Sequence, residues 1–130
     1  MDTKSFSHSI TCVGFDADDT LWHNETFFRL TQARLYELLS DFTDRATLER
    51  RLLAAERRNI SHYGIGIKGF ILSMVETAIE VTEARVSAKA IGEIVAAGRE
   101  MLSHPIELLP HARTAVEQAA QDHKVILITK

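Results

Sequence analysis

An apolar run that ends abruptly in acid constrains the fold of this chain more than any other feature. Residues 10–15 (ITCVGF) carry no charge and include β-branched side chains, and the acidic segment 16–20 (DADDT) follows directly. An apolar run of this kind is typical of a buried strand in a parallel sheet. The carboxylates then stand at the C-terminal end of the strand, where open α/β sheets bind their ligands. The junction therefore predicts an α/β fold with a functional site at residues 16–20.

The charge of this junction favours a bound cation. Asp16, Asp18 and Asp19 place three carboxylates within four residues, and such groups repel one another in a partly desolvated crevice unless a cation offsets their charge. Mg²⁺ prefers one or two carboxylates together with water and phosphate oxygens. The ordinary alternative is a solvated loop acid, or a cap for the next helix, and for Asp19 both interpretations stay open.

Three segments resemble motifs of one known family. Residues 15–21 (FDADDTL) resemble the first motif of the haloacid dehalogenase-like hydrolase superfamily, in which an aspartate at a strand end is the nucleophile. Residues 125–129 (VILIT) resemble its second motif, an apolar strand that ends in a phosphate-binding Thr or Ser. Residues 108–112 (LLPHA) resemble the segment that leads into the second motif, although a glycine is more usual where His111 stands. The resemblance spans essentially the whole chain and is most specific in the first motif.

Within this resemblance, Asp18 indicates a phosphatase-type member. In relatives that cleave carbon–halogen bonds, the residue two positions after the nucleophile is typically not acidic. An alkoxide leaving group needs a proton and the attacking water must later lose one, whereas a halide needs no proton. A second carboxylate at this position therefore favours a small phosphate ester as substrate.

The resemblance implies a role for each site residue. Asp16 would attack phosphorus and form an aspartyl-phosphate, with Mg²⁺ screening the approach of the two anions. Asp18 would protonate the leaving oxygen and then activate water, and Asp16 together with the Asp18 backbone carbonyl would bind the metal. Thr129 would hold a phosphoryl oxygen. Thr20 is expected to fix the turn, and Lys68 is a candidate substrate contact whose ordinary alternative is a surface lysine.

Between the two motif strands, apolar residues at helical spacing predict four helices. The third follows the pattern from Ile67 to Ile79, and the fourth begins at Ser87. A loop is expected at residues 61–68. Inserted after the first strand, these helices resemble the cap of many superfamily members. The expected fold class is therefore α/β: a partial Rossmann-like parallel sheet (residues 1–23 and 106–130) with an inserted helical cap bundle (residues 24–105).

The superfamily pattern continues beyond the second motif with a lysine that braces the phosphate and with one or two acids that complete the Mg²⁺ site. Lys130 follows Thr129 directly, so we do not assign that lysine's role to it. We expect these 130 residues to be the N-terminal part of a longer enzyme.

Composition narrows the partners and the location. The net charge of −3 argues mildly against nucleic acid, and the arginine pairs at 50–51 and 57–58 are interleaved with glutamates, which is typical of a solvated, salt-bridged helix face. The lone Cys12 excludes an internal disulfide and is expected to pack in the core. No signal-peptide pattern or membrane-spanning run is visible, so a cytoplasmic location without membrane partners is the expectation.

Two other function classes stay open. One is a glycosyltransferase in which a D-x-D motif holds Mn²⁺ and a nucleotide diphosphate, although such a motif usually follows a longer nucleotide-binding domain. The other is a non-catalytic phosphate-binding or interaction module derived from the same fold.

Overall fold

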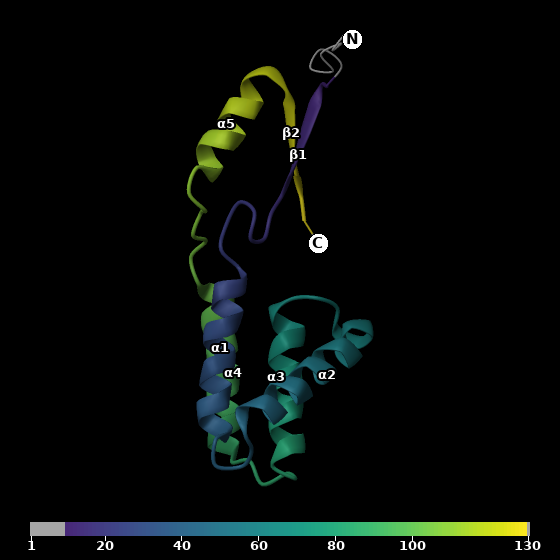
Figure 1. Ribbon diagram of the computed structural model, residues 1–130, viewed down its shortest axis with the longest axis vertical. Helices are drawn as coiled ribbons and strands as arrows, with labels where there is room; N and C mark the ends of the chain where they lie inside the picture. Colours follow the sequence, from purple (N-terminus) through teal and green to yellow (C-terminus); the bar gives the residue numbers. More distant parts are fainter. Residues whose placement is uncertain (1–9, 130) are drawn as a thin grey trace. The chain divides into compact units, whose positions relative to one another are not determined.

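The computed structural model describes residues 10–129, which form two compact units (Figure 1). The sheet unit contains residues 10–25 and 105–129, and the helical unit contains Thr26–His104. The chain thus leaves the sheet unit once, builds the helical unit and returns. Residues 1–9 and 130, which the sequence assigns to the partial Rossmann-like sheet, lie outside the described residues. Whether the helical unit acts as a cap, as the expected division at residues 24–105 implies, stays a prediction.

The sheet unit is built on two parallel strands. β1 (Cys12–Asp16) pairs with β2 (Lys124–Ile128), and the register places Cys12 opposite Lys124 and Asp16 opposite Ile128. A parallel pair requires a long crossover, and here the helical unit and α5 (Ala112–Asp122) lie between the strands in sequence. α5 packs against β2. The expected α/β class, with parallel strands at the two motifs, is confirmed.

The expected burial of the first strand is wrong for the described residues. Val13 and Phe15 are half-buried, whereas Cys12, Gly14 and Asp16 are exposed. Parallel strands are fully buried only when helices cover both faces of their sheet, and among the described elements α5 is the helix that packs on β2. Cys12 therefore carries an exposed thiol instead of packing in a core.

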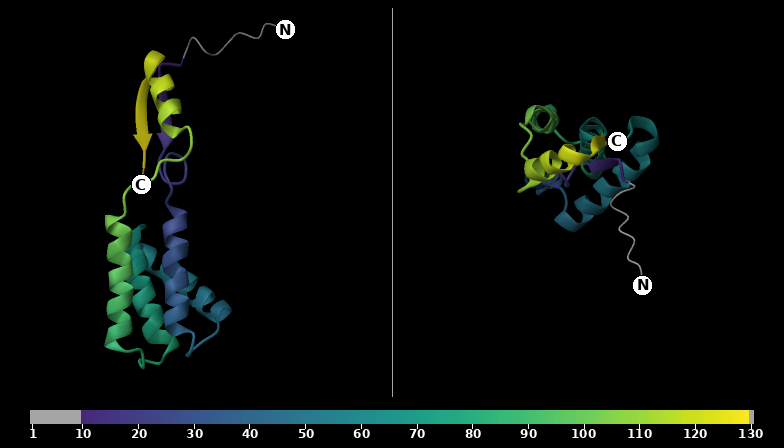
Figure 2. Two further views of the ribbon diagram at one scale, coloured as in Figure 1. Left: turned by 90° about the vertical axis from the view of Figure 1, so that its left-hand side faces the viewer. Right: turned by 90° about the horizontal axis from the view of Figure 1, so that it is seen from above.

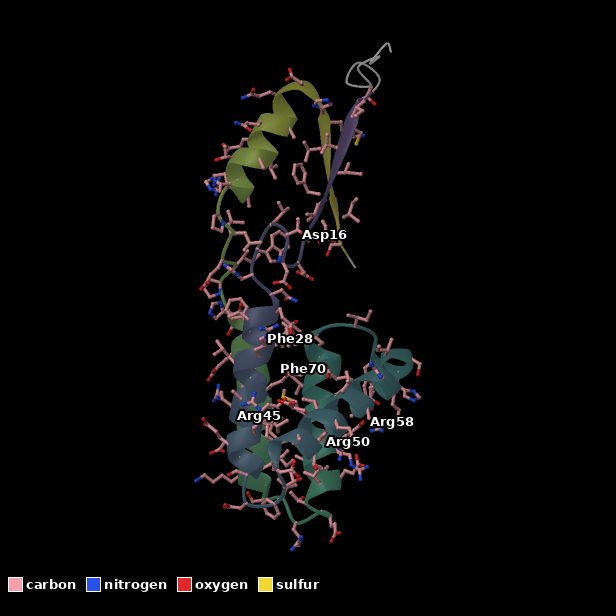
Figure 3. The ribbon with its side chains drawn as sticks, in the orientation of Figure 1. Asp16, Phe28, Arg45, Arg50, Arg58 and Phe70 are labelled. Carbon is pink, nitrogen blue, oxygen red and sulfur yellow. The ribbon has the colours of Figure 1, made fainter. Side chains whose placement is uncertain are left out.

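The helical unit is formed by α1 (Glu25–Leu39), α2 (Arg45–Tyr63), α3 (Ile67–Val81) and α4 (Ala88–Ser103) (Figure 2). α3 packs against both α2 and α4. Phe28 of α1 meets Phe70 of α3 with ring centroids 4.9 Å apart (Figure 3). The four expected helices are present, and their apolar faces meet in one cluster of buried side chains: Leu35, Leu39, Leu48, Leu52, Phe70, Met74, Ala78, Ile94 and Met101.

Side-chain caps fix where two of these helices begin. The Ser87 side chain accepts a hydrogen bond from the Ala90 backbone N–H at 3.0 Å, which confirms the expected start of the fourth helix. The Asp44 carboxylate accepts from the Thr47 backbone N–H at 3.0 Å at the start of α2. Hydrogen bonds from Thr47 lower the pKa of Asp44.

The loop expected at residues 61–68 is shorter than predicted. α2 continues to Tyr63 and α3 begins at Ile67, which leaves Gly64-Ile65-Gly66 between them. Gly64 and Gly66 have φ values of 74° and 136°, where a side chain is strained. The two glycines therefore allow a tight reversal that needs only three residues.

Two glycines of α4 form a matched test of the packing between α3 and α4. A Cβ at Gly98 would overlap the Ile71 side chain of α3, whereas a Cβ at Gly92 would meet open space. Gly98→Ala should lower the free energy of unfolding by about 1–3 kcal/mol because of overpacking. Gly92→Ala should raise it by about 0.5–1 kcal/mol through better helix propensity. Urea denaturation of both variants checks this, and equal effects would contradict close packing at Gly98.

A polar network joins α2 and α3. Buried Asn59 donates to Ser73 Oγ at 3.1 Å and to Glu76 Oε2 at 2.7 Å. Tyr63 Oη donates to the other Glu76 oxygen at 3.3 Å, and the Arg58 guanidinium pairs with Glu76 at 3.3 Å. With the Arg51–Glu80 pair at 2.7 Å, one arginine of each arginine pair in α2 forms an ion pair with a glutamate of α3.

The network predicts a pH dependence of stability. The Asn59 hydrogen bond, with help from Arg58 and Tyr63, lowers the pKa of Glu76 from its ordinary value of 4.5. A carboxyl group whose pKa is lower in the folded than in the unfolded state stabilises the fold when the pH is above its unfolded-state pKa. This stabilisation is lost as the pH falls through the folded-state pKa. Glu76→Gln should therefore be less stable than the wild type at about pH 7, and the difference should shrink under acid.

Urea denaturation of the wild type and of Glu76→Gln, from about pH 7 down to acidic pH, measures how the difference in their unfolding free energies changes. Glu80→Gln, one turn further along α3, removes an exposed ion pair and serves as the control, with an expected effect of less than about 1 kcal/mol. A difference between wild type and Glu76→Gln that persists unchanged at low pH would contradict the assignment.

Candidate active site

The parallel register brings the two motifs to one edge of the sheet. β1 ends at Asp16, which pairs with Ile128, the last residue of β2, and Thr129 follows immediately. Asp16 and Thr129 are both exposed, and Figure 3 shows Asp16 at the end of β1. An aspartate and a threonine hydroxyl therefore share the C-terminal edge of the strand pair, where α/β folds bind ligands.

A tight turn after β1 orients Asp16. The backbone N–H groups of Thr20 and Leu21 both donate to the carbonyl of Ala17, at 3.1 and 2.8 Å, and the Ala17 side chain is buried. The turn carries the Thr20 hydroxyl back to the strand end, where it donates to Asp16 Oδ2 at 2.7 Å. Thr20 was expected only to fix the turn. Its contact with the Asp16 carboxylate is a role that the sequence did not reveal.

Asp18 has a donor of its own. The indole Nε1–H of Trp22 donates to Asp18 Oδ1 at 2.9 Å. No motif in the sequence assigns this contact to Trp22. The signal available was its spacing, because Trp22 follows Asp18 by four residues as Thr20 follows Asp16.

Asp19 caps the first helix. Its carboxylate accepts from the backbone N–H of Asn24 at 3.0 Å and from that of Glu25 at 3.1 and 3.2 Å, where α1 begins. Its φ of 59° lies in the left-handed region, which Asp tolerates better than most residues. Of the two interpretations left open for Asp19, the capping interpretation is the one that the structure supports.

Substitutions at Asp19 should separate capping from backbone strain. Asp19→Gly loses the cap but suits the left-handed φ, and should cost about 1 kcal/mol of unfolding free energy. Asp19→Ala loses the cap and adds strain, for a total of about 2–3 kcal/mol. Denaturation followed by fluorescence of Trp22, the single tryptophan, reports on the sheet unit directly. Equal losses of unfolding free energy in the two variants would show that backbone strain at residue 19 contributes nothing.

A comparison with solved structures identifies the fold family. No protein-family model and no curated protein matches the chain. A crystal structure of a haloacid dehalogenase-like family hydrolase from Xanthomonas campestris matches it with a TM-score of 0.85 and 47% sequence identity. The match covers 91% of this chain and 49% of that chain. The chain belongs to the haloacid dehalogenase-like superfamily. It spans about half the length of that relative.

For this haloacid dehalogenase-like chain, the segment before the second motif also has a structural explanation. His111 precedes α5 with a φ of 66°, in the left-handed region. Glycine adopts this conformation without strain, which explains why a glycine is more usual there in the superfamily. His111 supplies the same turn with a side chain that tolerates it better than most.

The described residues include oxygen donors of the kind that Mg²⁺ prefers. The Asp16 carboxylate and the Asp18 carbonyl are hard oxygen donors, which suit Mg²⁺. Across residues 10–129, no group of three or more His, Cys, Asp or Glu side chains is arranged to hold a metal. These oxygens therefore fit the ion chemically, and water, phosphate oxygens or other residues would have to supply the remaining ligands.

Lys68, the remaining candidate, lies in the other unit. It is exposed in the first turn of α3, whereas Asp16, Asp18 and Thr129 belong to the sheet unit. Its contact with substrate stays a prediction.

None of the helices described is long and apolar enough to cross a membrane.

Proposed function

We propose that this chain carries the nucleophile and the acid–base group of a Mg²⁺-dependent phosphatase, which acts on a small phosphate ester through an aspartyl-phosphate. The observation that carries the proposal is the placement of Asp16 and Thr129 at the same C-terminal edge of the strand pair, with Asp18 in the adjoining turn. Membership of the superfamily supports it.

In the first step, a carboxylate oxygen of Asp16 attacks phosphorus and the bond from phosphorus to the ester oxygen breaks. Because the Thr20 hydroxyl engages Oδ2, Oδ1 is the oxygen that we assign to the attack. Asp18 gives its proton to the departing oxygen, so that the first product leaves as a neutral alcohol.

In the second step, Asp18 is a carboxylate and takes a proton from water. The water oxygen attacks phosphorus, and the bond from phosphorus to Asp16 breaks. Inorganic phosphate leaves, the Asp16 carboxylate is restored and Asp18 is protonated again. One carboxyl group thus serves first as acid and then as base.

The remaining groups bind and orient the phosphate. The Thr129 hydroxyl and backbone N–H would hold a phosphoryl oxygen as pre-positioned donors. Asp16 and the Asp18 carbonyl would hold Mg²⁺, which would supply neutralising charge between carboxylate and phosphate. A role for Lys68 in substrate binding stays a prediction.

Turnover of p-nitrophenyl phosphate with Mg²⁺ and with EDTA tests the proposal. The assay uses the 130-residue chain and a fusion with the part of the Xanthomonas relative that the chain does not cover. The fusion should release phosphate only with Mg²⁺, and the chain alone should be at best feebly active because its metal site is partial. Phosphate binding without turnover in both forms would favour a non-catalytic module. Halide release from a 2-haloacid without phosphatase activity would overturn the substrate class.

A further inference from the structure

We propose that Trp22 is a positioning residue that fixes which oxygen of Asp18 carries the transferred proton. The proposal rests on the acid–base role of Asp18 in the proposed function. It goes further by naming which oxygen of Asp18 carries the proton. It also names the Trp22 indole N–H as the group that selects this oxygen.

The turn holds Trp22 firmly with respect to Asp18. The Trp22 carbonyl accepts from the backbone N–H of Asp19 at 2.8 Å, and Trp22 forms an antiparallel bridge with Leu108. On either side of Trp22, the backbone N–H of Leu109 donates to the Leu21 carbonyl at 2.9 Å, and the backbone N–H of His23 donates to the Glu107 carbonyl at 2.9 Å. The backbone of Trp22 is thus fixed between the acidic turn and the returning chain, and the hydrogen bond to Asp18 sets the direction of the indole.

The chemistry of the indole determines what the contact with Asp18 does. An indole N–H can only donate a hydrogen bond, and it does not titrate near neutral pH. While it donates to Asp18 Oδ1, that oxygen must act as an acceptor. Because the carbonyl oxygen of a carboxyl group is a better acceptor than its hydroxyl oxygen, this contact favours Oδ2 as the oxygen that carries the transferred proton. The same Oδ2 gives the proton to the leaving oxygen and later receives one from water.

The ring of Trp22 borders open space in the sheet unit. The indole lines a small, mostly apolar cavity of about 280 Å³ in the sheet unit, together with Leu21, Leu108 and Ala112. A phenyl ring would keep an aromatic surface beside this cavity, but it has no N–H to offer Asp18. Trp22→Phe therefore removes the donor and keeps an aromatic ring, while Leu108→Ala changes the packing and keeps the donor.

Kinetics of these two variants in the active fusion separate positioning from packing. With an alkyl phosphate, whose departure depends on proton donation, Trp22→Phe should lower kcat/KM about tenfold, as expected for loss of one charge-assisted hydrogen bond. With p-nitrophenyl phosphate the loss in kcat/KM should stay below about twofold, because kcat/KM reports only the step in which the leaving group departs. Leu108→Ala should show no dependence on the leaving group. Equal losses of Trp22→Phe on both substrates, or the same pattern in Leu108→Ala, would overturn the positioning role.

A measurement on the 130-residue chain tests the hydrogen bond without any turnover. The single tryptophan gives one indole N–H resonance, whose hydrogen exchange NMR can follow. Exchange should accelerate in Asp18→Ala, less so in Asp18→Asn, and not at all in the control Asp122→Ala, which alters the last residue of α5.

The hydrogen-exchange experiment and the kinetic experiment distinguish failure of this inference from failure of the proposed function. Unchanged exchange in Asp18→Ala would overturn the inference whatever the enzyme does, because the hydrogen bond would be absent. A protected indole N–H in a fusion that hydrolyses no phosphate ester would overturn the proposed function, and the positioning role of Trp22 would fall with it.

Discussion

Asp16→Asn should lower phosphatase turnover at least about a thousandfold and leave the fold intact. The amide has nearly the shape of the carboxylate, and its oxygen can still accept the hydrogen bond from Thr20. It is a far weaker nucleophile toward phosphorus, so the first chemical step fails. Initial rates on p-nitrophenyl phosphate, with urea denaturation of the same protein, check both parts of this expectation.

Asp122→Asn provides the matched control, because it makes the same substitution at an exposed position of α5 in the same unit. It should retain the wild-type rate. An asparagine can deamidate to aspartate, so the mass of the peptide that carries the substitution must be checked after the assay. Retention of more than a small fraction of activity, with the amide intact, would remove Asp16 from the nucleophilic role.

Asp18→Asn should lower turnover by about 10²–10⁴-fold for substrates with poor leaving groups. The loss should be much smaller in the first step for good leaving groups, because these depart without a proton. A series of aryl and alkyl phosphates, with kcat/KM plotted against the leaving-group pKa, measures this dependence because kcat/KM reports the first step alone, and the variant should give the steeper slope. Equal losses across the series would remove Asp18 from the acid role.

The elements that position the site could be predicted because local patterns determine them. The apolar run before Asp16 and the run before Thr129 are strands at almost the expected residues, and they pair in parallel. The apolar spacing of α3 and the cap at Ser87 likewise appear where expected. In each case, the residues that determine the element are its own or its immediate neighbours.

Properties that depend on distant or backbone-specific geometry were not predictable. The exposure of Cys12 depends on which helices cover the sheet, and a strand's own sequence does not report this. The contacts of Thr20 with Asp16 and of Trp22 with Asp18 depend on a turn in which Asp19 is left-handed. No apolar periodicity encodes such a turn. Sequence spacing could have suggested these pairs but not the direction of their side chains.

Trapping the covalent intermediate tests the central claim most directly. Asp18→Asn in the active fusion should form the aspartyl-phosphate from p-nitrophenyl phosphate, because this leaving group needs no proton. The variant should then hydrolyse the intermediate slowly, because water lacks its base. After acid quenching, peptide mass spectrometry should find one phosphoryl group on the peptide that contains Asp16, and none when Asp16→Asn is added. Phosphoryl transfer to another residue, or turnover with no phosphorylated peptide under these conditions, would contradict the account.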